Sequence, residues 1–170
     1  MDASSIINIA ASGHAKEIMA IVSEQVFVCS YVREKECLYL RSVDEDAVET
    51  IQLAEWQQAG ILQDCELTAL EEEQFLVYAS QVDDGEAMSL AIARARGFTL
   101  ITDDRKAQRL ATSAGITLLT TPQIFHVWAA GQHPRTVSEV LRAVERRARY
   151  RPSEGDPLNA WWLSACDRRE

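Results

Sequence analysis

The chain has 170 residues, of which 47% are hydrophobic and 25% charged, with a formal net charge of −9. These values are typical of one folded, soluble domain with a real core and a moderate tail. The acidic balance excludes broad nucleic-acid binding by a basic surface, though not a nuclease whose acids surround a cation. No apolar run reaches the length of a membrane span, and the N-terminus lacks the features of a secretory signal, so a cytoplasmic protein is expected.

Short apolar runs alternate with stretches of helical periodicity along the chain. We expect strands over 26–32, 61–67, 98–102 and 116–120. We expect helices over 4–24, 33–42, 45–59, 68–81, 84–96, 104–114, 121–131 and 136–149. Gly97 and Gly115 each stand between a helical stretch and a strand, as helix-terminating glycines do. This rhythm predicts an α/β fold with a parallel central sheet.

The segment after Gly131 differs in character, and we place a boundary there, with a main domain over 1–131 and a helical tail over 132–170. The tail contains a basic amphipathic helix and ends near the adjacent pair Trp161 and Trp162. These rings either dock on the chain's own domain or form a surface for a partner chain. The first reading is favoured.

Acidic side chains gather where strands end and helices begin. They are Asp2, Glu34, Glu36, Asp83, Asp84, Glu86, Asp103 and Asp104. Positions that follow parallel strands meet at one edge of the sheet, so these acids are expected to converge. Each one taken singly is explained as a helix cap. Taken together they exceed what capping needs, and carboxylate oxygens are the ligands that a hard divalent cation prefers.

Several segments together resemble the PIN domain, the family of Mg²⁺/Mn²⁺-dependent ribonucleases that includes the VapC toxins. The matching segments are DASSIIN, DDGEAMSLAIARARG, LITDDRKAQRLA and ITLLTTP, together with a glutamate after the first apolar run. The resemblance covers about residues 1–131 and implies a three-layer α/β/α sandwich around a parallel sheet. It also implies hydrolysis of RNA phosphodiester bonds with Mg²⁺ or Mn²⁺ as cofactor.

The resemblance assigns roles residue by residue. The implied catalytic acids are Asp2, Glu36, Glu86 and Asp104, with Glu34 as a substitute for Glu36. The implied metal ligands are Asp2, Glu86, Asp104 and Asp103. Ser4, Asn8 and Thr102 support these acids, and Arg105 and Lys106 contact the substrate, although exposed basic residues are more often only a solvated helix face. The implied partners are RNA, a cognate antitoxin and a second copy of the chain, with no membrane.

One departure from the family concerns the start of the chain. Family members have a strand before the first aspartate, whereas Asp2 here directly follows Met1. Either the natural chain begins further upstream, or the first helix alone holds Asp2, which would leave it loosely placed. The second case favours an alternative function, a catalytically impaired PIN-like module that binds a partner. A phospho-acceptor receiver domain is disfavoured, because too little chain follows Asp104.

Overall fold

A computed structural model describes residues 1–23, 25–35, 38–41 and 48–167. The chain forms two compact units, each assembled from separate segments. The first unit contains Met1–Ile6, Gln25–Cys37 and Gln52–Thr120, and the second contains Ile7–Glu24, Leu38–Ile51 and Thr121–Glu170. The predicted boundary at residue 131 is not tested by this division and stays a prediction.

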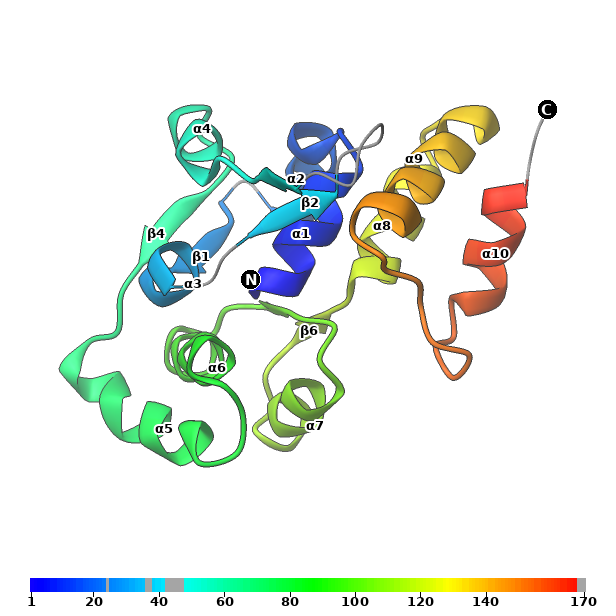
Figure 1. Cartoon of the computed structure of the whole chain (residues 1–170). Helices are drawn as coiled ribbons and strands as arrows, with labels where there is room; N and C mark the ends of the chain where they lie inside the picture. The colour runs from blue at the N-terminus through cyan, green and yellow to red at the C-terminus, as the bar shows by residue number, and fades with distance from the viewer. Residues whose placement is uncertain (24, 36–37, 42–47, 168–170) are drawn as a thin grey trace. The chain divides into compact units, whose positions relative to one another are not determined.

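The first unit holds two pairs of parallel strands. β1 (Phe27–Cys29) pairs with β4 (Gln63–Cys65), and β5 (Leu100–Ile101) pairs with β6 (Leu118–Leu119) (Figure 1). Each strand lies inside one of the four predicted apolar runs and is shorter than that run. The predicted α/β class with parallel strands is therefore confirmed, although the sheets are small.

The first two residues are bonded to both parallel pairs. The main-chain nitrogen of Met1 donates to the Phe27 carbonyl oxygen at 2.9 Å, and that of Asp2 donates to the Ile101 carbonyl oxygen at 3.1 Å. A central strand between β1 and β5 would make the same kind of bonds. Asp2 is therefore not held by its helix alone, and the expectation of a loosely placed aspartate is wrong.

The helices of the first unit surround these strands. They are α3 (Ser30–Lys35), α4 (Leu53–Gln58), α5 (Ala69–Ala79), α6 (Asp84–Arg96) and α7 (Arg105–Ser113). The last three confirm the helices predicted over 68–81, 84–96 and 104–114. α6 packs on β1 and β5 and lies beside α5 (Figure 1). The predicted stop at Gly97 is also confirmed, because this residue ends α6 in the left-handed conformation with φ of 67°.

Small side chains on α6 form the centre of a hydrophobic core. Ala87, Leu90 and Ala91 are fully buried and pack with Leu100 of β5 and Ala111 of α7. Alanine on this face lets the helix approach its neighbours closely, so its first turn has a fixed position. That first turn carries Glu86, one of the predicted acids.

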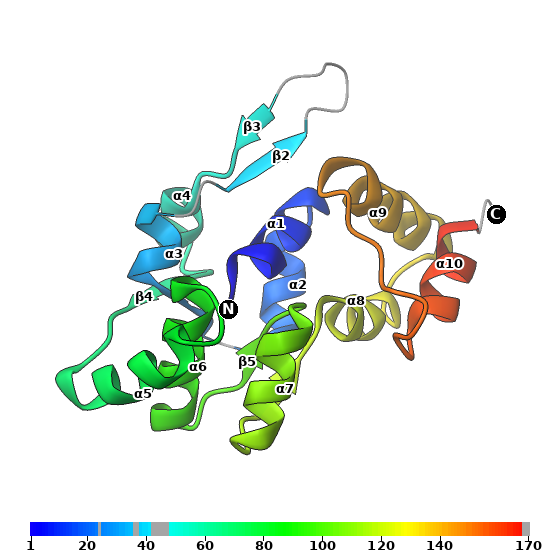
Figure 2. The ribbon, with the colours of Figure 1, turned by 60° about the horizontal axis from the view of Figure 1, so that its bottom comes forward.

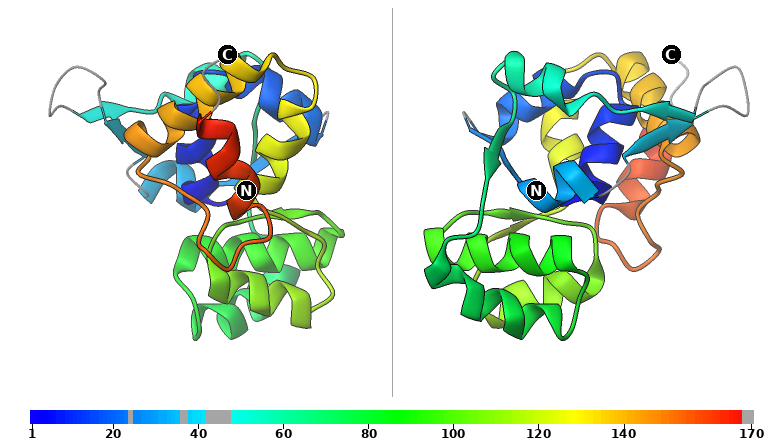
Figure 3. Two further views of the ribbon diagram at one scale, coloured as in Figure 1. Left: turned by 90° about the vertical axis from the view of Figure 1, so that its right-hand side faces the viewer. Right: turned by 60° about the vertical axis from the view of Figure 1, so that its left-hand side comes forward.

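The second unit is mainly helical. It contains most of α1 (Ala3–Ala11), together with α2 (Ala15–Val22), α8 (Thr121–Ala129), α9 (Pro134–Arg147) and α10 (Asn159–Asp167). Its strands β2 (Tyr39–Arg41) and β3 (Val48–Thr50) pair antiparallel (Figure 2). α10 packs on α9 (Figure 3), and the buried Trp162 donates its indole N–H to Glu145 at 3.0 Å. Among the helices described, none combines the length and apolar character that crossing a bilayer requires.

Two predicted helices are only partly right where β2 and β3 form. In the range 33–42 the helix α3 ends at Lys35 and β2 follows, and in the range 45–59 only α4 is helical, after β3. Leu38 and Leu40 are buried while Tyr39 and Arg41 are exposed, which is the two-residue period of a strand. Charged residues with good helix propensity precede this short alternation, so the sequence pattern favoured a helix over a strand. Residues 36–37 and 42–47 lie outside the described part of the chain.

The long helix predicted over 4–24 is interrupted once. α1 ends at Ala11 and α2 begins at Ala15, and Gly13 between them has a φ of 72°. A left-handed residue cannot continue a right-handed helix, so the chain turns at this glycine. The apolar periodicity continues across the break, which explains the merged prediction.

A partly buried ion pair fixes α5 against α6. Arg96 donates to both carboxylate oxygens of Glu71, at 2.7 and 2.8 Å, and also to the Glu66 carbonyl oxygen. Glu71 completes a capping box with Thr68, and its side chain is 5% exposed. The hydrogen bond from Arg96 lowers the pKa of Glu71 to about 2, against the opposing effect of burial.

We predict that Glu71→Gln lowers the free energy of unfolding at pH 7 by about 1–3 kcal/mol, because Arg96 loses its charged partner. Since the folded pKa of Glu71 is lowered, its contribution is present above the unfolded value of about 4.5 and is lost as pH falls toward about 2. Urea unfolding followed by circular dichroism at several pH values measures this. Glu72→Gln, at the exposed neighbouring position, is the control, and equal effects at pH 7 would contradict the prediction.

Candidate functional site

Asp2 is buried at the start of α1. Its Oδ1 accepts a hydrogen bond from the main-chain N–H of Ser5 at 2.8 Å and another from the Ser4 hydroxyl at 3.1 Å. The residue is 4% exposed. The bond from Ser5 satisfies a helix N–H that would otherwise have no partner, and the two bonds together fix the direction of the carboxylate.

Asp104 occupies the equivalent position at the start of α7. Its Oδ1 accepts from the main-chain N–H groups of Lys106 and Ala107, both at 2.7 Å. Its own N–H donates to the hydroxyl of the buried Thr102 at 3.1 Å, and the Thr102 N–H donates to the Leu119 carbonyl oxygen. The end of β5 and the start of α7 are thus joined into one rigid corner that carries the aspartate.

Glu86 lies in the first turn of α6, three residues after the N-cap residue Asp83. The pKa of Glu86 is raised to about 7, first by burial and then by the negative charges of Asp104, Asp2 and Asp83, in that order of size. A hydrogen bond from the Asp83 main-chain N–H acts in the opposite direction. Glu86 is therefore a half-buried acid with three like charges near it.

The effect of Asp2 and Asp104 on the pKa of Glu86 indicates that the three carboxylates share one region, which we call the acidic site. All three residues belong to the first unit. Each lies in or directly before the first turn of a helix, where the positive end of the helix dipole stabilises negative charge.

The carboxylates of the acidic site are suitable ligands for a hard cation, but their oxygens do not converge on one point. Carboxylate oxygens are the ligands that Mg²⁺ and Mn²⁺ take in proteins. Within the described part of the chain, however, no three His, Cys, Asp or Glu side chains are close enough to hold a metal ion as they stand. Glu36, a predicted member of the set, lies outside the described residues.

The remaining predicted residues lie as follows. Glu34, the substitute for Glu36, is exposed and pairs with Arg33 at 2.7 Å. Asp103 is half-buried directly before Asp104, and Arg105 and Lys106 are exposed in the first turn of α7. Asn8 belongs to the second unit, where its amide donates to the Thr121 hydroxyl at 3.4 Å. The roles assigned to these residues stay predictions.

Asp83 is a member of the electrostatic environment that the assignment from sequence left out. It acts on Glu86 both through its charge and through its main-chain N–H. The pattern Asp-x-x-Glu at 83–86 is the spacing of a capping box, in which the fourth residue bonds back to the first. That spacing is a sequence signal that could have pointed to Asp83.

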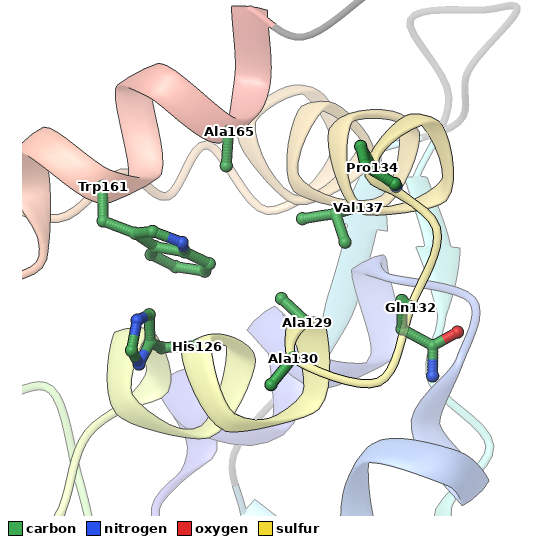
Figure 4. Close-up of a pocket in the computed structure, with 8 residues that line it drawn as sticks. All are labelled: His126, Ala129, Ala130, Gln132, Pro134, Val137, Trp161 and Ala165. Carbon is green, nitrogen blue, oxygen red and sulfur yellow. The ribbon is translucent and has the colours of Figure 1, made fainter. Parts of the chain in front are cut away.

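A separate pocket of about 220 Å³ lies in the second unit, among α8, α9 and α10 (Figure 4). His126 and Trp161 form one end of it, with their rings edge to face and centroids 4.7 Å apart. Most of the other lining residues are small and apolar, such as Ala129, Val137 and Ala165. This lining contains no carboxylate, so the pocket is chemically unlike the acidic site.

Comparison with known protein families identifies the chain. A family model described as DUF3368, a PIN domain, matches residues 1–155. The chain belongs to the PIN domain family. PIN domains are generally nucleases and generally use divalent metal ions, so at this coarse level the protein is a hydrolase of nucleic acids. The match extends beyond residue 131 and includes α9. Comparisons with curated proteins and with solved structures give no match.

We predict that Glu86 titrates with a pKa of about 7 in the metal-free PIN domain, and that Asp104→Asn lowers this pKa, because the negative charge of Asp104 favours the protonated acid. Asparagine retains the cap of α7, so the fold is kept. Carbon-detected NMR of glutamate side chains measures the pKa directly. An unchanged Glu86 pKa in the variant would show that the two side chains are too far apart to act together.

Proposed function

We propose that this PIN domain protein is a Mg²⁺- or Mn²⁺-dependent endoribonuclease that hydrolyses RNA phosphodiester bonds at the acidic site. The observation that carries the proposal is the raised pKa of Glu86, caused by burial and by the charges of Asp104 and Asp2. Carboxylates that three separate helices bring together in a nuclease family repel one another when all of them are ionised. A divalent cation removes that repulsion.

Asp2, Glu86 and Asp104 would hold the ion. The capping bonds of the two aspartates end on Oδ1, so Oδ2 of each is not needed for the cap and suits a metal ligand. Glu86 would give up its proton on binding, because a ligating carboxylate must be ionised. The bound ion would activate a water molecule and stabilise charge on the scissile phosphate.

The other residues would position the substrate. Arg105 and Lys106 stand exposed beside Asp104, where their side chains would contact phosphate oxygens without reading base identity. Hydrolysis forms a bond from water oxygen to phosphorus and breaks the bond to the leaving ribose oxygen, which takes up a proton. Thr102 and Ser4 would hold Asp104 and Asp2 in position during this step.

We further propose that the protein acts as the toxin of a toxin–antitoxin pair, as a homodimer. This part of the proposal depends on the VapC-like motifs around Asp2, Glu86 and Asp104 alone. Expression of the chain with and without its genomic neighbour tests it, because a toxin arrests growth only when its antitoxin is missing.

One observation favours the second candidate function, an impaired partner-binding module. The described carboxylates do not stand in a metal-holding arrangement, so cation binding requires them to rotate inward. If that rotation is too costly, the PIN fold would persist without catalysis. The two candidates differ in a single measurable property, which is metal-dependent cleavage.

We predict that the protein cleaves fluorescently labelled RNA only with Mg²⁺ or Mn²⁺, and that Asp104→Asn slows cleavage by about a hundredfold or more. The asparagine keeps the helix cap but removes a charged metal ligand. Asp84→Asn is the matched control, because Asp84 is an exposed acid in the first turn of α6 with the same charge change. Metal-independent cleavage, or equal rates for the two variants, would refute the nuclease site.

Glu86→Gln provides a test that separates loss of activity from unfolding. We predict that this variant is inactive yet more stable than the wild type at pH 8, by about 1–2 kcal/mol once the shift is discounted for solvent screening of the half-buried carboxylate. The folded pKa of Glu86 is raised, so its ionisation destabilises the fold as pH rises from about 4.5 to about 7. Urea unfolding at pH 5 and pH 8 gives the comparison. A variant less stable than the wild type at pH 8 would contradict the assigned environment of Glu86.

A further inference from the structure

Three large apolar side chains on α5 face solvent. Leu70 is 92% exposed, Leu76 is 66% exposed and Val77 is 51% exposed. In the described part of the chain, no other helix carries more than one exposed residue of this kind. A single exposed leucine is ordinary on a protein surface, whereas several on one short helix commonly mark an interaction site. We call Leu70, Leu76 and Val77 the apolar set.

The apolar set belongs to a side of α5 that the rest of the first unit leaves uncovered. Among the described elements, α5 makes its main contacts with α6 (Figure 1). Leu70 and Val77 are seven residues apart, so they lie two turns apart on nearly the same side of the helix. Glu72 and Glu73 are exposed in the turn between them. The uncovered side of α5 is therefore apolar at both ends and acidic in the middle.

The charge around the apolar set is uniformly negative. From residue 42 to residue 93 the sequence contains no Lys, Arg or His. Glu72 and Glu73 form no ion pair with any residue that the structure describes. Arg96 of α6 does reach α5, but it is already bound to both carboxylate oxygens of Glu71. The two exposed glutamates are therefore open to a cationic side chain from another molecule.

We propose that the uncovered side of α5 is a docking surface for a basic amphipathic helix of a partner protein. Such a helix would place apolar residues seven positions apart against Leu70 and Val77. A Lys or Arg between them would pair with Glu72 and Glu73. Removing the apolar set from water drives the binding, and the charges select the partner and its orientation. The inference goes beyond the proposed nuclease function and does not depend on it.

Other occupants fit this surface less well. In a symmetric dimer, a second copy would bring its own Glu72 and Glu73 against the first pair, and like charges repel. The helix α9 of a second copy offers arginines, but none of the exposed large hydrophobic residues in the described chain lies on it. Nucleic acids and anionic lipid surfaces are negatively charged, as this side of α5 is. A basic helix with an apolar side meets both requirements.

Fluorescence anisotropy of the full chain with a labelled peptide measures the docking. The probe is a helix-forming peptide of about 16 residues made of Ala, Leu and Arg, with leucines seven positions apart and an arginine between them. A shuffled peptide of the same composition, which has no apolar side, is the reference. We expect the patterned peptide to bind the wild type about tenfold tighter or more, because it alone can cover the apolar set.

Substitution of the apolar set tests the surface itself. We expect alanine at all three of its positions to weaken binding of the patterned peptide about tenfold or more. The midpoint of thermal unfolding should stay unchanged, because the removed side chains are exposed and alanine keeps the helix. The control carries alanine at three exposed apolar residues on helices of the second unit, Ile21, Val127 and Leu163. Equal affinities for the two triple variants overturn the inference.

A second pair of variants separates docking from the general attraction of a basic peptide to an acidic protein. Glu72→Gln with Glu73→Gln removes two charges beside the apolar set, and Glu139→Gln with Glu154→Gln removes two exposed charges from the second unit. At about 150 mM salt we expect the first variant to bind the patterned peptide at least about threefold more weakly than the second. Equal losses overturn the inference, because they would indicate attraction by net charge alone.

Two further outcomes separate a partner from a second copy and docking from cleavage. If sedimentation velocity of the free protein shows a dimer that alanine in the apolar set abolishes, the inference is overturned in favour of a second copy. Docking that depends on the apolar set and on Glu72 and Glu73 supports the inference whatever the cleavage assay shows. A protein that docks the peptide but never cleaves RNA would refute the nuclease alone.

Discussion

The capping of helices by carboxylates is the interaction on which the acidic site depends. Asp2 caps α1, Asp104 caps α7, and Glu86 accepts a hydrogen bond from the main-chain N–H of Asp83, the N-cap residue of α6. Main-chain donors and helix dipoles stabilise negative charge at each of these points. Three acids that repel one another can therefore stay near each other in a folded chain. Capping and cation binding are not alternatives here, because the caps hold the prospective ligands in place.

In the acidic site, the stability of the metal-free fold and the binding of a metal favour different protonation states of Glu86. Glu86 has its pKa raised to about 7, so the ionised form that a metal needs is the form that the metal-free fold disfavours. Sites with this property are common where binding or catalysis has been selected over stability. The hydrogen bond that Glu86 accepts from the Asp83 main-chain N–H offsets only part of this rise in pKa.

Much of the fold could be read from the sequence, and the exceptions have physical causes. Long periodic segments with glycine stops predicted α6 and α7, since apolar spacing and the left-handed Gly97 act locally. β2 and β3 were missed because a three-residue strand shows too little alternation to outweigh neighbouring helix-forming residues. The bonds from Met1 and Asp2 to β1 and β5 were missed because main-chain hydrogen bonds leave no residue-type signature. For the acids, sequence could predict where they gather but not whether they chelate, since caps and ligands use the same residue types.

The ion pair between Glu71 and Arg96 has a consequence for the acidic site. Arg96 is the last residue of α6 and Glu86 lies in its first turn, so the helix has an attractive ion pair at its end and repulsion between acids at its start. Local opening of the α5–α6 hairpin would move Glu86 away from Asp2 and Asp104, together with the first turn of α6. Because α6 forms the centre of the core in the first unit, such an opening would involve that whole core. The position of Glu86 is therefore tied to the cooperative folding of the first unit.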